Sequence, residues 1–217
     1  MRVACVIVPH LALQLVCRKR PDLAQQPVII PDPQNPRRVF DLSLAAHNCG
    51  VSPGMSVRTA VGLCSTAAIV TCDAPLIDGA FASLVDVMAS MSPAVELLPP
   101  DTFYLGIARG WGGISDETAL LHSLLLAIRE RTGLRVRSGS GAGRFTARVA
   151  AMLAEDDAVR TIAPGDEGAT LAPLPIALLP CSAEIERRLQ LYGLRTLGDI
   201  ATLPAGPLQA QFGPEGL

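Results

Sequence analysis

Few side chains in this sequence could support catalysis, and Asp101 is the most suggestive of them. It follows two prolines within VELLPPDTFYLG (residues 95–106), a pattern typical of a β-hairpin. Near the N-terminus an apolar strand, VIVPHLA (residues 6–12), runs straight into a predicted helix and carries no carboxylate. Hard divalent cations need several oxygen ligands, so one aspartate holds them poorly. A lone aspartate in a turn is also commonly a solvated residue, and the pattern leaves both interpretations open.

Arginine is the second residue type that could do chemistry. Lys19 is the only lysine among 18 Lys and Arg residues, in a chain of net charge −2. Glu130 is the only acid in a stretch that carries Arg129, Arg131, Arg135, Arg137, Arg144 and Arg148. A local basic stretch in a near-neutral chain suits a surface that meets phosphates on one side. A solvated helix-and-strand face would have the same composition.

The cysteines, the histidines and one glycine-rich loop give no recognised catalytic or metal-binding pattern. The six cysteines include no C-x-x-C pair, and several lie in apolar runs, so we expect small, buried, reduced thiols. His10 and His47 have no sequence partner for nucleophilic or general-base work, and His122 falls within a predicted helix, so we expect structural roles for all three. GSGAGR (residues 139–144) has Arg144 where a dinucleotide fingerprint needs glycine, and no Lys-Ser/Thr follows as in a phosphate loop.

Length and composition indicate a globular protein. The 217 residues suffice for one large domain or two modest ones, and 49% of them are apolar. The apolar N-terminus is interrupted by Pro9, His10 and Gln14 and is followed by three basic residues, unlike a signal peptide. No stretch approaches the roughly 20 apolar residues of a membrane span. We therefore expect a cytoplasmic protein without a membrane partner.

Hydrophobic periodicity predicts an α+β fold. Strands are expected at residues 3–8, 27–30, 38–41, 67–72, 95–98, 103–107 and 134–137. Helices are expected at residues 11–20, 43–50, 53–64, 76–91, 118–131, 145–153, 183–192 and 197–203. With residues 11–73 set aside, the order is strand, helix, hairpin, helix, strand, helix. That order predicts a ferredoxin-like sheet interrupted by an inserted block.

Two proline-containing stretches, residues 162–166 and 171–175, mark a boundary before the C-terminal helices. The last two predicted helices flank Gly193, with Thr196 as a cap, and suggest a helix-hairpin-helix. Such turns offer backbone N–H groups to a phosphate, and three arginines lie nearby, Arg187, Arg188 and Arg195. A plain helical hairpin packed on a core is the alternative.

Five motifs in one order give the chain a family resemblance. They are GVSPGM (residues 50–55), LRV with SGSG (134–136 and 138–141), LAPLP (171–175), LYGLRTLGDIA (191–201) and Phe212-Gly213. In this order and spacing the chain resembles the Y-family (translesion) DNA polymerases over essentially its whole length. The resemblance implies a ferredoxin-like palm (residues 1–10 and 74–163), inserted helical fingers (11–73) and a helix-hairpin-helix thumb (164–217). It also implies an incomplete thumb and a missing little finger domain, so we expect a fragment.

The departures from the family pattern concern its chemistry. In that family three carboxylates hold two Mg²⁺ ions, which activate the primer hydroxyl and stabilise the leaving pyrophosphate. The matching positions here hold Ile7, Asp101 and Thr102. The resemblance therefore implies no catalytic residues and no cofactor, with Asp101 the only surviving metal candidate and Mg²⁺ needed only for residual polymerase activity.

Other substrate contacts of the family are also changed. The aromatic gate under the sugar is Ala12, and the Tyr and Arg that contact the incoming triphosphate are Leu44 and His47. Two family lysines have counterparts of like charge, Arg144 and Arg148. By this resemblance we expect Arg144, Arg148, Arg187, Arg188 and Arg195 to bind primer-template DNA without regard to sequence.

The match is closest to ImuB-type proteins, non-catalytic relatives with a UmuC-like domain. That resemblance implies a DNA-binding adaptor in translesion synthesis, damage-induced mutagenesis and DNA repair. Its implied partners are the sliding clamp, a RecA-like ImuA-type protein and an error-prone replicative-type polymerase, mostly through the missing C-terminal region. Two alternatives stay open: a divergent active polymerase that uses Asp41, Asp73 or Glu96, and a palm-like module without a DNA role.

Overall fold

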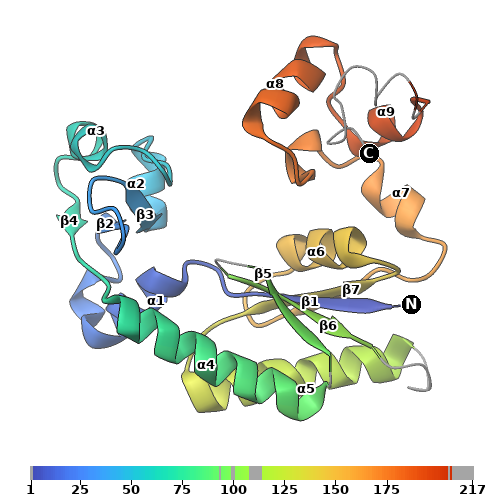
Figure 1. Cartoon of the computed structure of the whole chain (residues 1–217), viewed down its shortest axis with the longest axis horizontal. Helices are drawn as coiled ribbons and strands as arrows, with labels where there is room; N and C mark the ends of the chain where they lie inside the picture. Colours follow the sequence, from blue (N-terminus) through green and yellow to red (C-terminus); the bar gives the residue numbers. More distant parts are fainter. Residues whose placement is uncertain (1, 93, 99–100, 108–113, 205, 207–217) are drawn as a thin grey trace.

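The chain is built around a five-stranded sheet with helices on both faces (Figure 1). The computed structural model describes residues 2–92, 94–98, 101–107, 114–204 and 206. The strands are β1 (Val3–Ile7), β2 (Val28–Pro31), β3 (Val39–Leu42), β4 (Ala68–Ile69), β5 (Val95–Leu98), β6 (Thr102–Gly106), β7 (Arg137–Gly141) and β8 (Val159–Thr161). The helices are α1 (Leu11–Lys19), α2 (Leu44–Asn48), α3 (Val57–Leu63), α4 (Ala74–Met91), α5 (Ile114–Thr132), α6 (Arg144–Leu153), α7 (Glu167–Leu171), α8 (Ala183–Leu191) and α9 (Leu197–Ala201), with short 3-10 turns η1 (Pro21–Leu23) and η2 (Ile176–Leu178).

The strand order of the central sheet is β5-β6-β1-β7-β8. β1 pairs antiparallel with β6, from Val3 opposite Gly106 to Ile7 opposite Thr102, and also antiparallel with β7. The first four of these strands have the split βαβ order that the sequence predicted, so the expected pairing of β1 with β6 is confirmed. β8 was not predicted; it is only three residues long and adds to the edge parallel to β7.

The main core lies on the face of the sheet that α4 and α5 cover (Figure 1). Leu84 and Met88 of α4, Ile128 of α5 and Phe103 of β6 are fully buried there. α1 supplies Leu15 to the same core. Each such side chain contributes about 1.5–3 kcal/mol on burial, so this layer fixes the positions of the strand ends.

The helix α4 has 18 residues and a mean hydropathy of 1.3, the length and composition of a membrane span. No stretch of this kind was expected from the sequence. Four of its residues, Ile77, Leu84, Val87 and Met88, are buried in the core. Packing on the sheet accounts for this apolar stripe.

The opposite face of the sheet is covered by α6, which lies unusually close to β7. The sequence predicted a strand at residues 134–137, whereas the strand is Arg137–Gly141 and the predicted part only enters it. That prediction was wrong because half of the residues after Arg137 in this strand are glycine, which has a low strand propensity. A Cβ on Gly139 would lie 2.1 Å from the backbone nitrogen of Ala151 on α6, so the small residues here permit the contact between helix and strand.

A second, smaller block contains the sheet β3-β2-β4 and the helices α2 and α3. Its own core includes Ile29, Leu42, Ala46 and Ala60. Two expectations here were wrong in extent. The predicted helix at residues 53–64 begins only at Val57, because the Ser56 side chain caps it by accepting from the Thr59 N–H. The predicted strand at residues 67–72 is the two-residue β4.

The C-terminal helices lie on the side of the sheet that carries α6 (Figure 1). The helices α8 and α9 occur where the sequence predicted them, on either side of Gly193, whose φ is +82°. Thr196 and Asp199 form a capping box at the start of α9. The short α7 was not predicted, and the Phe212-Gly213 motif and the hairpin prolines Pro99 and Pro100 lie outside the described residues.

Substitution of Gly139 by alanine should destabilise the fold by about 3 kcal/mol, because the added Cβ meets helix backbone that cannot move aside. Gly79→Ala is the matched control. Gly79 lies in α4 with open space around its Cα, and alanine there should stabilise by about 0.5–1 kcal/mol. Urea unfolding of both variants measures the difference. Equal stabilities would show that α6 does not lie this close to β7.

Candidate functional site at the ends of the central strands

The antiparallel pairing of β1 and β6 brings the three candidate positions together. Ile7 lies opposite Thr102, and the Val8 N–H donates to the Asp101 carbonyl at 2.9 Å. The Thr102 hydroxyl donates to Asp101 Oδ1 at 2.9 Å. The carboxylate of Asp101 therefore stands at the end of these two strands, beside an isoleucine and a threonine.

Burial is the largest influence on Asp101 and raises its pKa. The Thr102 hydrogen bond and the charge of Arg148 oppose this shift, while the charge of Asp41 adds to it. The effect of burial on the pKa of Asp101 is thus offset only in part by the hydrogen bond and by nearby positive charge. Among the residues that the structure describes, no group of three or more His, Cys, Asp and Glu could hold a metal ion.

Beside this site lies a histidine–aspartate pair that sequence reasoning missed. His10 Nδ1 lies 2.7 Å from Asp41 Oδ1, and His10 adopts a left-handed conformation with φ of +50°. Asp41 Oδ2 accepts the Leu13 N–H at 3.0 Å and so caps α1 from another element. His10 was expected to lack a partner, because 31 residues separate the pair and no local pattern joins them.

Two arginines predicted to bind DNA lie one turn apart on α6. The guanidinium of Arg144 forms an ion pair with Glu96 and lies 5.6 Å from the centroid of the Tyr104 ring. Arg148 is only partly exposed, and its Nε–H is buried without a hydrogen-bond partner among the described residues. Unsatisfied buried donors are uncommon in proteins, so Arg148 has spare capacity for an acceptor at this end of the sheet.

The basic stretch that the sequence showed is partly neutralised in three dimensions. Arg129 pairs with Asp157 at 2.9 Å, and Arg137 pairs with Asp156 at 2.7 Å. Arg135 also approaches Asp156, at 3.5 Å. These acids come after α6 and therefore fell outside the sequence window that suggested a strong excess of positive charge.

The other predicted DNA contacts belong to the C-terminal helices. Arg187 on α8 is exposed and pairs with Glu184 at 3.0 Å. Arg188 is its neighbour on α8, and Arg195 follows in the turn before α9. Arg195 lines a cavity of about 360 Å³ with Pro175, Ile176, Ala177 and Gln190. The structure thus places the five arginines in two groups, one on α6 and one around α8.

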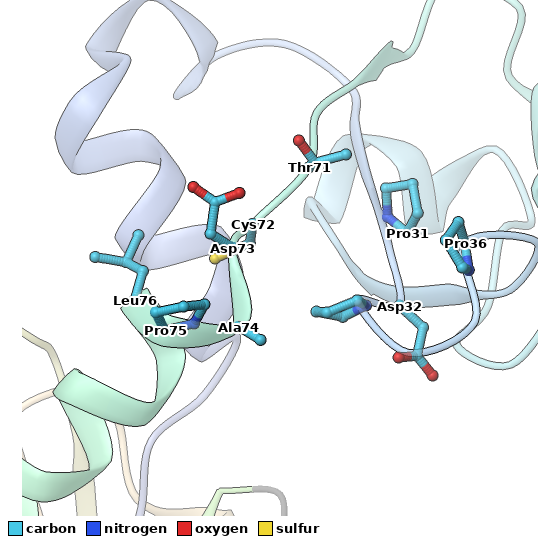
Figure 2. Close-up of a pocket in the computed structure, with 10 residues that line it drawn as sticks. Pro31, Asp32, Pro36, Thr71, Cys72, Asp73, Ala74, Pro75 and Leu76 are labelled. Carbon is cyan, nitrogen blue, oxygen red and sulfur yellow. The ribbon is translucent and has the colours of Figure 1, made fainter.

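Of the alternative acids, only Asp41 lies close enough to Asp101 to affect its pKa. Glu96 is held by Arg144. Asp73 lines a separate open cavity of about 710 Å³ where the loop after β2 meets the start of α4. Figure 2 shows the carboxylates of Asp73 and Asp32 pointing apart in this cavity, which is otherwise lined largely by prolines. Their divergence gives that cavity no converging ligands for a cation.

Comparison with known proteins places this arrangement in context. The model of the impB/mucB/samB family matches residues 8–152. A DNA polymerase IV from Dehalococcoides mccartyi is 28% identical over 197 residues, which cover 89% of this chain and 50% of that protein. A DNA polymerase IV from Pelotomaculum thermopropionicum is 29% identical over 202 residues, covering 90% and 50%. The chain therefore spans about half the length of these curated relatives.

Solved structures share the fold. DinB from Sulfolobus solfataricus superposes with a TM-score of 0.87 at 20% identity, over 99% of this chain and 64% of that one. An insertion ternary complex of Dbh DNA polymerase gives 0.86 at 20% identity, over 98% and 64%. A Y-family DNA polymerase chimera gives 0.86 as well. At this identity the likeness establishes a shared fold.

These findings correct one expectation. No cofactor was expected from the sequence, yet the curated relatives are DNA polymerases IV and the fold is that of Y-family polymerases, which use Mg²⁺. The fold therefore points to a metal cofactor, and the expectation was wrong. The residues present fit such a site poorly, because Asp101 supplies a single carboxylate beside Ile7 and Thr102.

The His10–Asp41 pair should make stability depend on pH. The Asp41 hydrogen bond is the largest influence on His10 and raises its pKa above the usual value of about 6.5. Its stabilisation is therefore complete below about pH 6.5 and is lost as pH rises through the folded-state pKa. Because the His10 side chain is 58% exposed, we expect the pair to contribute less than about 1 kcal/mol to the free energy of unfolding.

The matched variant is His10→Asn, which tolerates the left-handed conformation and does not titrate. Urea unfolding near pH 6 and near pH 8.5 should show a larger loss of stability in the unmodified chain than in this variant. The same pH dependence in both proteins would rule out a contribution from the pair.

Proposed function

The chain belongs to the impB/mucB/samB family, and on that premise we propose that it is a non-catalytic, DNA-binding adaptor in translesion DNA synthesis. The observation that carries this proposal is the composition of the strand-end site, where Ile7 and Thr102 flank Asp101. DNA-damage-induced mutagenesis and DNA repair are the processes in which such an adaptor would act. The activity of the whole protein is part of the proposal, since the chain spans about half of its curated relatives.

We assign the domains from the resemblance and the packing together. Residues 1–10 and 74–163 would form the palm, 11–73 the fingers and 164–217 a helix-hairpin-helix thumb. The separate core around Ile29 and Leu42 supports the fingers as a unit. Leu15 and Val16 of α1 pack in the core of the central sheet, so the boundary after residue 10 passes through a shared core.

DNA would be bound through phosphates by arginines on one side of the sheet. Arg187, Arg188 and Arg195 belong to the α8–α9 hairpin, and Arg144 and Arg148 to the neighbouring face of the sheet (Figure 1). The unsatisfied Nε–H of Arg148 supports an acceptor from the ligand at this place. Contacts of this kind hold the backbone and carry no base information, so binding would be independent of sequence.

A divergent active polymerase is the second candidate, and Asp41 is the observation in its favour. Its charge acts on Asp101, so two carboxylates lie near the strand ends. However, Asp41 already bonds to His10 and to the Leu13 and Leu42 N–H groups. Recruiting it as a metal ligand would cost these bonds, which favours the adaptor.

The partners and the cellular location follow from the ImuB-type resemblance. A sliding clamp, a RecA-like ImuA-type protein and an error-prone replicative-type polymerase would supply the synthesis that this chain does not. We place the protein in the cytoplasm, where bacterial DNA is found. By the same resemblance, these partners would bind mostly through the C-terminal region of ImuB-type proteins.

Template-directed incorporation should be at least about 10⁴-fold below that of a DNA polymerase IV relative in the same assay, with Mg²⁺ or Mn²⁺. Stabilisation by two metal ions is worth several kcal/mol, and each 1.4 kcal/mol is a factor of ten. Primer extension measures this directly. Extension above background that Asp101→Ala abolishes would establish the active polymerase instead.

Binding to primer-template DNA should be weak and should fall steeply with salt, because arginine contacts release counterions. Replacing Arg187, Arg188 and Arg195 together by glutamate should weaken binding about 10-fold or more at low salt, equally for unrelated sequences. Arg20→Glu is the matched control: Arg20 is exposed and paired with Asp22 at 2.7 Å, as Arg187 is with Glu184. Fluorescence anisotropy reports both.

A salt-insensitive complex, or equal losses for the triple and the control variants, would contradict this assignment. Absence of binding at low ionic strength would favour a palm-like module without a DNA role.

A further inference from the structure

The outer face of α4 is apolar, and no other part of the described chain covers it. The helix has the mean hydropathy of a membrane span, yet only 22% of it is buried. Its buried residues lie along one side, at Ile77, Leu84, Val87 and Met88. On another side, exposed residues follow one another at intervals of three or four: Ala74, Asp78, Ala82, Val85 and Ala89. An exposed apolar face of this length commonly marks a surface that another molecule covers.

The serines of α4 add little polarity to its surface. The Ser83 hydroxyl donates to the Gly79 carbonyl at 2.9 Å, and the Ser90 hydroxyl donates to the Val87 carbonyl at 2.7 Å. Both hydroxyls are therefore bonded to the backbone of their own helix. The apolar side chains of the exposed face are also short, so a second helix could lie close against α4.

The charged groups of this helix all have one sign. α4 carries Asp78 and Asp86 and contains no Lys, Arg or His. Both carboxylates are exposed, and neither forms a hydrogen bond or an ion pair within the described part of the chain. Because they are eight residues apart, they lie about 12 Å apart along the helix axis. A partner with two positive charges at this spacing would pair with both.

The outer face of α4 begins at the open cavity of about 710 Å³ (Figure 2). The first turn of α4, from Ala74 to Leu76, forms one of its walls, and prolines of the loop after β2 form another. Proline side chains lose no rotamer freedom on binding, so this apolar wall is preformed. Asp73 makes no side-chain cap bond to α4, and none of the residues that line the cavity is basic. The cavity suits a large apolar side chain of a molecule that lies along α4.

From these observations we propose that the cavity and the outer face of α4 form one docking surface for a basic amphipathic helix of a partner protein. A large apolar side chain of that helix fills the cavity, and its small residues lie on Ala82 and Val85. Its Arg or Lys residues pair with Asp78 and Asp86. Helices that bind in grooves present anchors at this spacing.

The docking surface is separate from the arginine groups. α4 covers one face of the central sheet, whereas α6 and the C-terminal helices lie on the other side (Figure 1). A partner helix on α4 would therefore leave the arginines accessible. The proposal does not rest on DNA binding, and either activity can be lost without the other.

Charge distinguishes a basic helix from the other molecules that could cover this face. Nucleic acids and anionic lipids are negatively charged, so Asp78 and Asp86 would repel them. A second copy of the chain, packed with α4 against α4, would bring these acids close to the same acids of its partner. A basic helix gains from both the apolar residues and the carboxylates.

The probe for this surface is a fluorescein-labelled helical peptide of about 18 residues, built from Ala, Leu and Gln. It carries two Arg eight residues apart and a Trp one turn beyond each Arg, so that it can align in either direction. Fluorescence anisotropy with the whole chain should show saturable binding. A matched peptide with Glu in place of both Arg should bind at least about 10-fold more weakly.

Charge reversal on α4 should exchange the preference between the two peptides. Asp78→Arg combined with Asp86→Arg should weaken binding of the Arg peptide about 10-fold or more and should strengthen binding of the Glu peptide. Glu155→Arg combined with Asp166→Arg is the matched control, because both acids are exposed, lie outside α4 and change the net charge equally. The control should keep both affinities within about 3-fold.

A second pair of variants tests the apolar part of the surface. Ala82→Gln should weaken binding of the Arg peptide, because a longer side chain separates the two helices. Ser83→Gln is the control: Ser83 is also exposed, but it lies about 100° further around the same helix. Glutamine is a good helix former, so α4 should persist in both variants.

Three outcomes would overturn the proposal. The first is failure of the Arg peptide to bind, or equal affinity for the two peptides. The second is an equal loss of affinity in the two charge-reversal variants. The third is dimerisation, or sedimentation with phosphatidylserine vesicles, that Ala82→Gln abolishes, because a second copy or a membrane would then be the occupant of this face.

Discussion

The pairing of β1 with β6 and β7 in the middle of the sheet is the constraint on which the rest of the structure depends. This register sets Ile7 opposite Thr102 and places Asp101 next to Val8. It is held from one side by the large core under α4 and α5 and from the other by α6, whose backbone contacts Gly139. A slip of one residue would move every side chain of β1 to the wrong face. The geometry of a strand-end site is thus fixed independently of the residues that occupy it.

That independence means that the fold can tolerate different residues at this site. Ile7 and Thr102 both fit the strand ends, since Ile7 packs beside α6 and Thr102 bonds to Asp101. Beside them, the polar side chains of His10 and Asp41 are hydrogen-bonded to each other. The left-handed backbone of His10 is a local cost that this bond and the cap on α1 offset. The fold points to a Mg²⁺ cofactor, whereas only one of the three strand-end positions, Asp101, holds a carboxylate.

Much of the fold was predictable because its signals are local. An apolar β-branched run predicted β1, an aromatic-rich run in the hairpin pattern predicted β6, and the cap at Thr196 predicted the start of α9. The strand β7 was misplaced because its small residues allow close contact with α6. This contact between distant segments cannot be read from a local stretch of sequence. The three candidate metal positions at the strand ends were identified through the family pattern. The contacts of Arg129, Arg137 and Arg144 with acids, and of His10 with Asp41, depend on tertiary folding and could not be foreseen.

The most direct measurement is the fraction of primer extended when all of the primer is bound. A labelled primer-template is titrated with the chain at low salt until anisotropy saturates, and nucleotides with Mg²⁺ are then added to the same sample. A DNA-binding adaptor leaves the bound primer at its original length, because Ile7 and Thr102 stand where metal ligands are required. Primer that lengthens while bound, and that stops lengthening in Asp101→Ala, would contradict the proposed function.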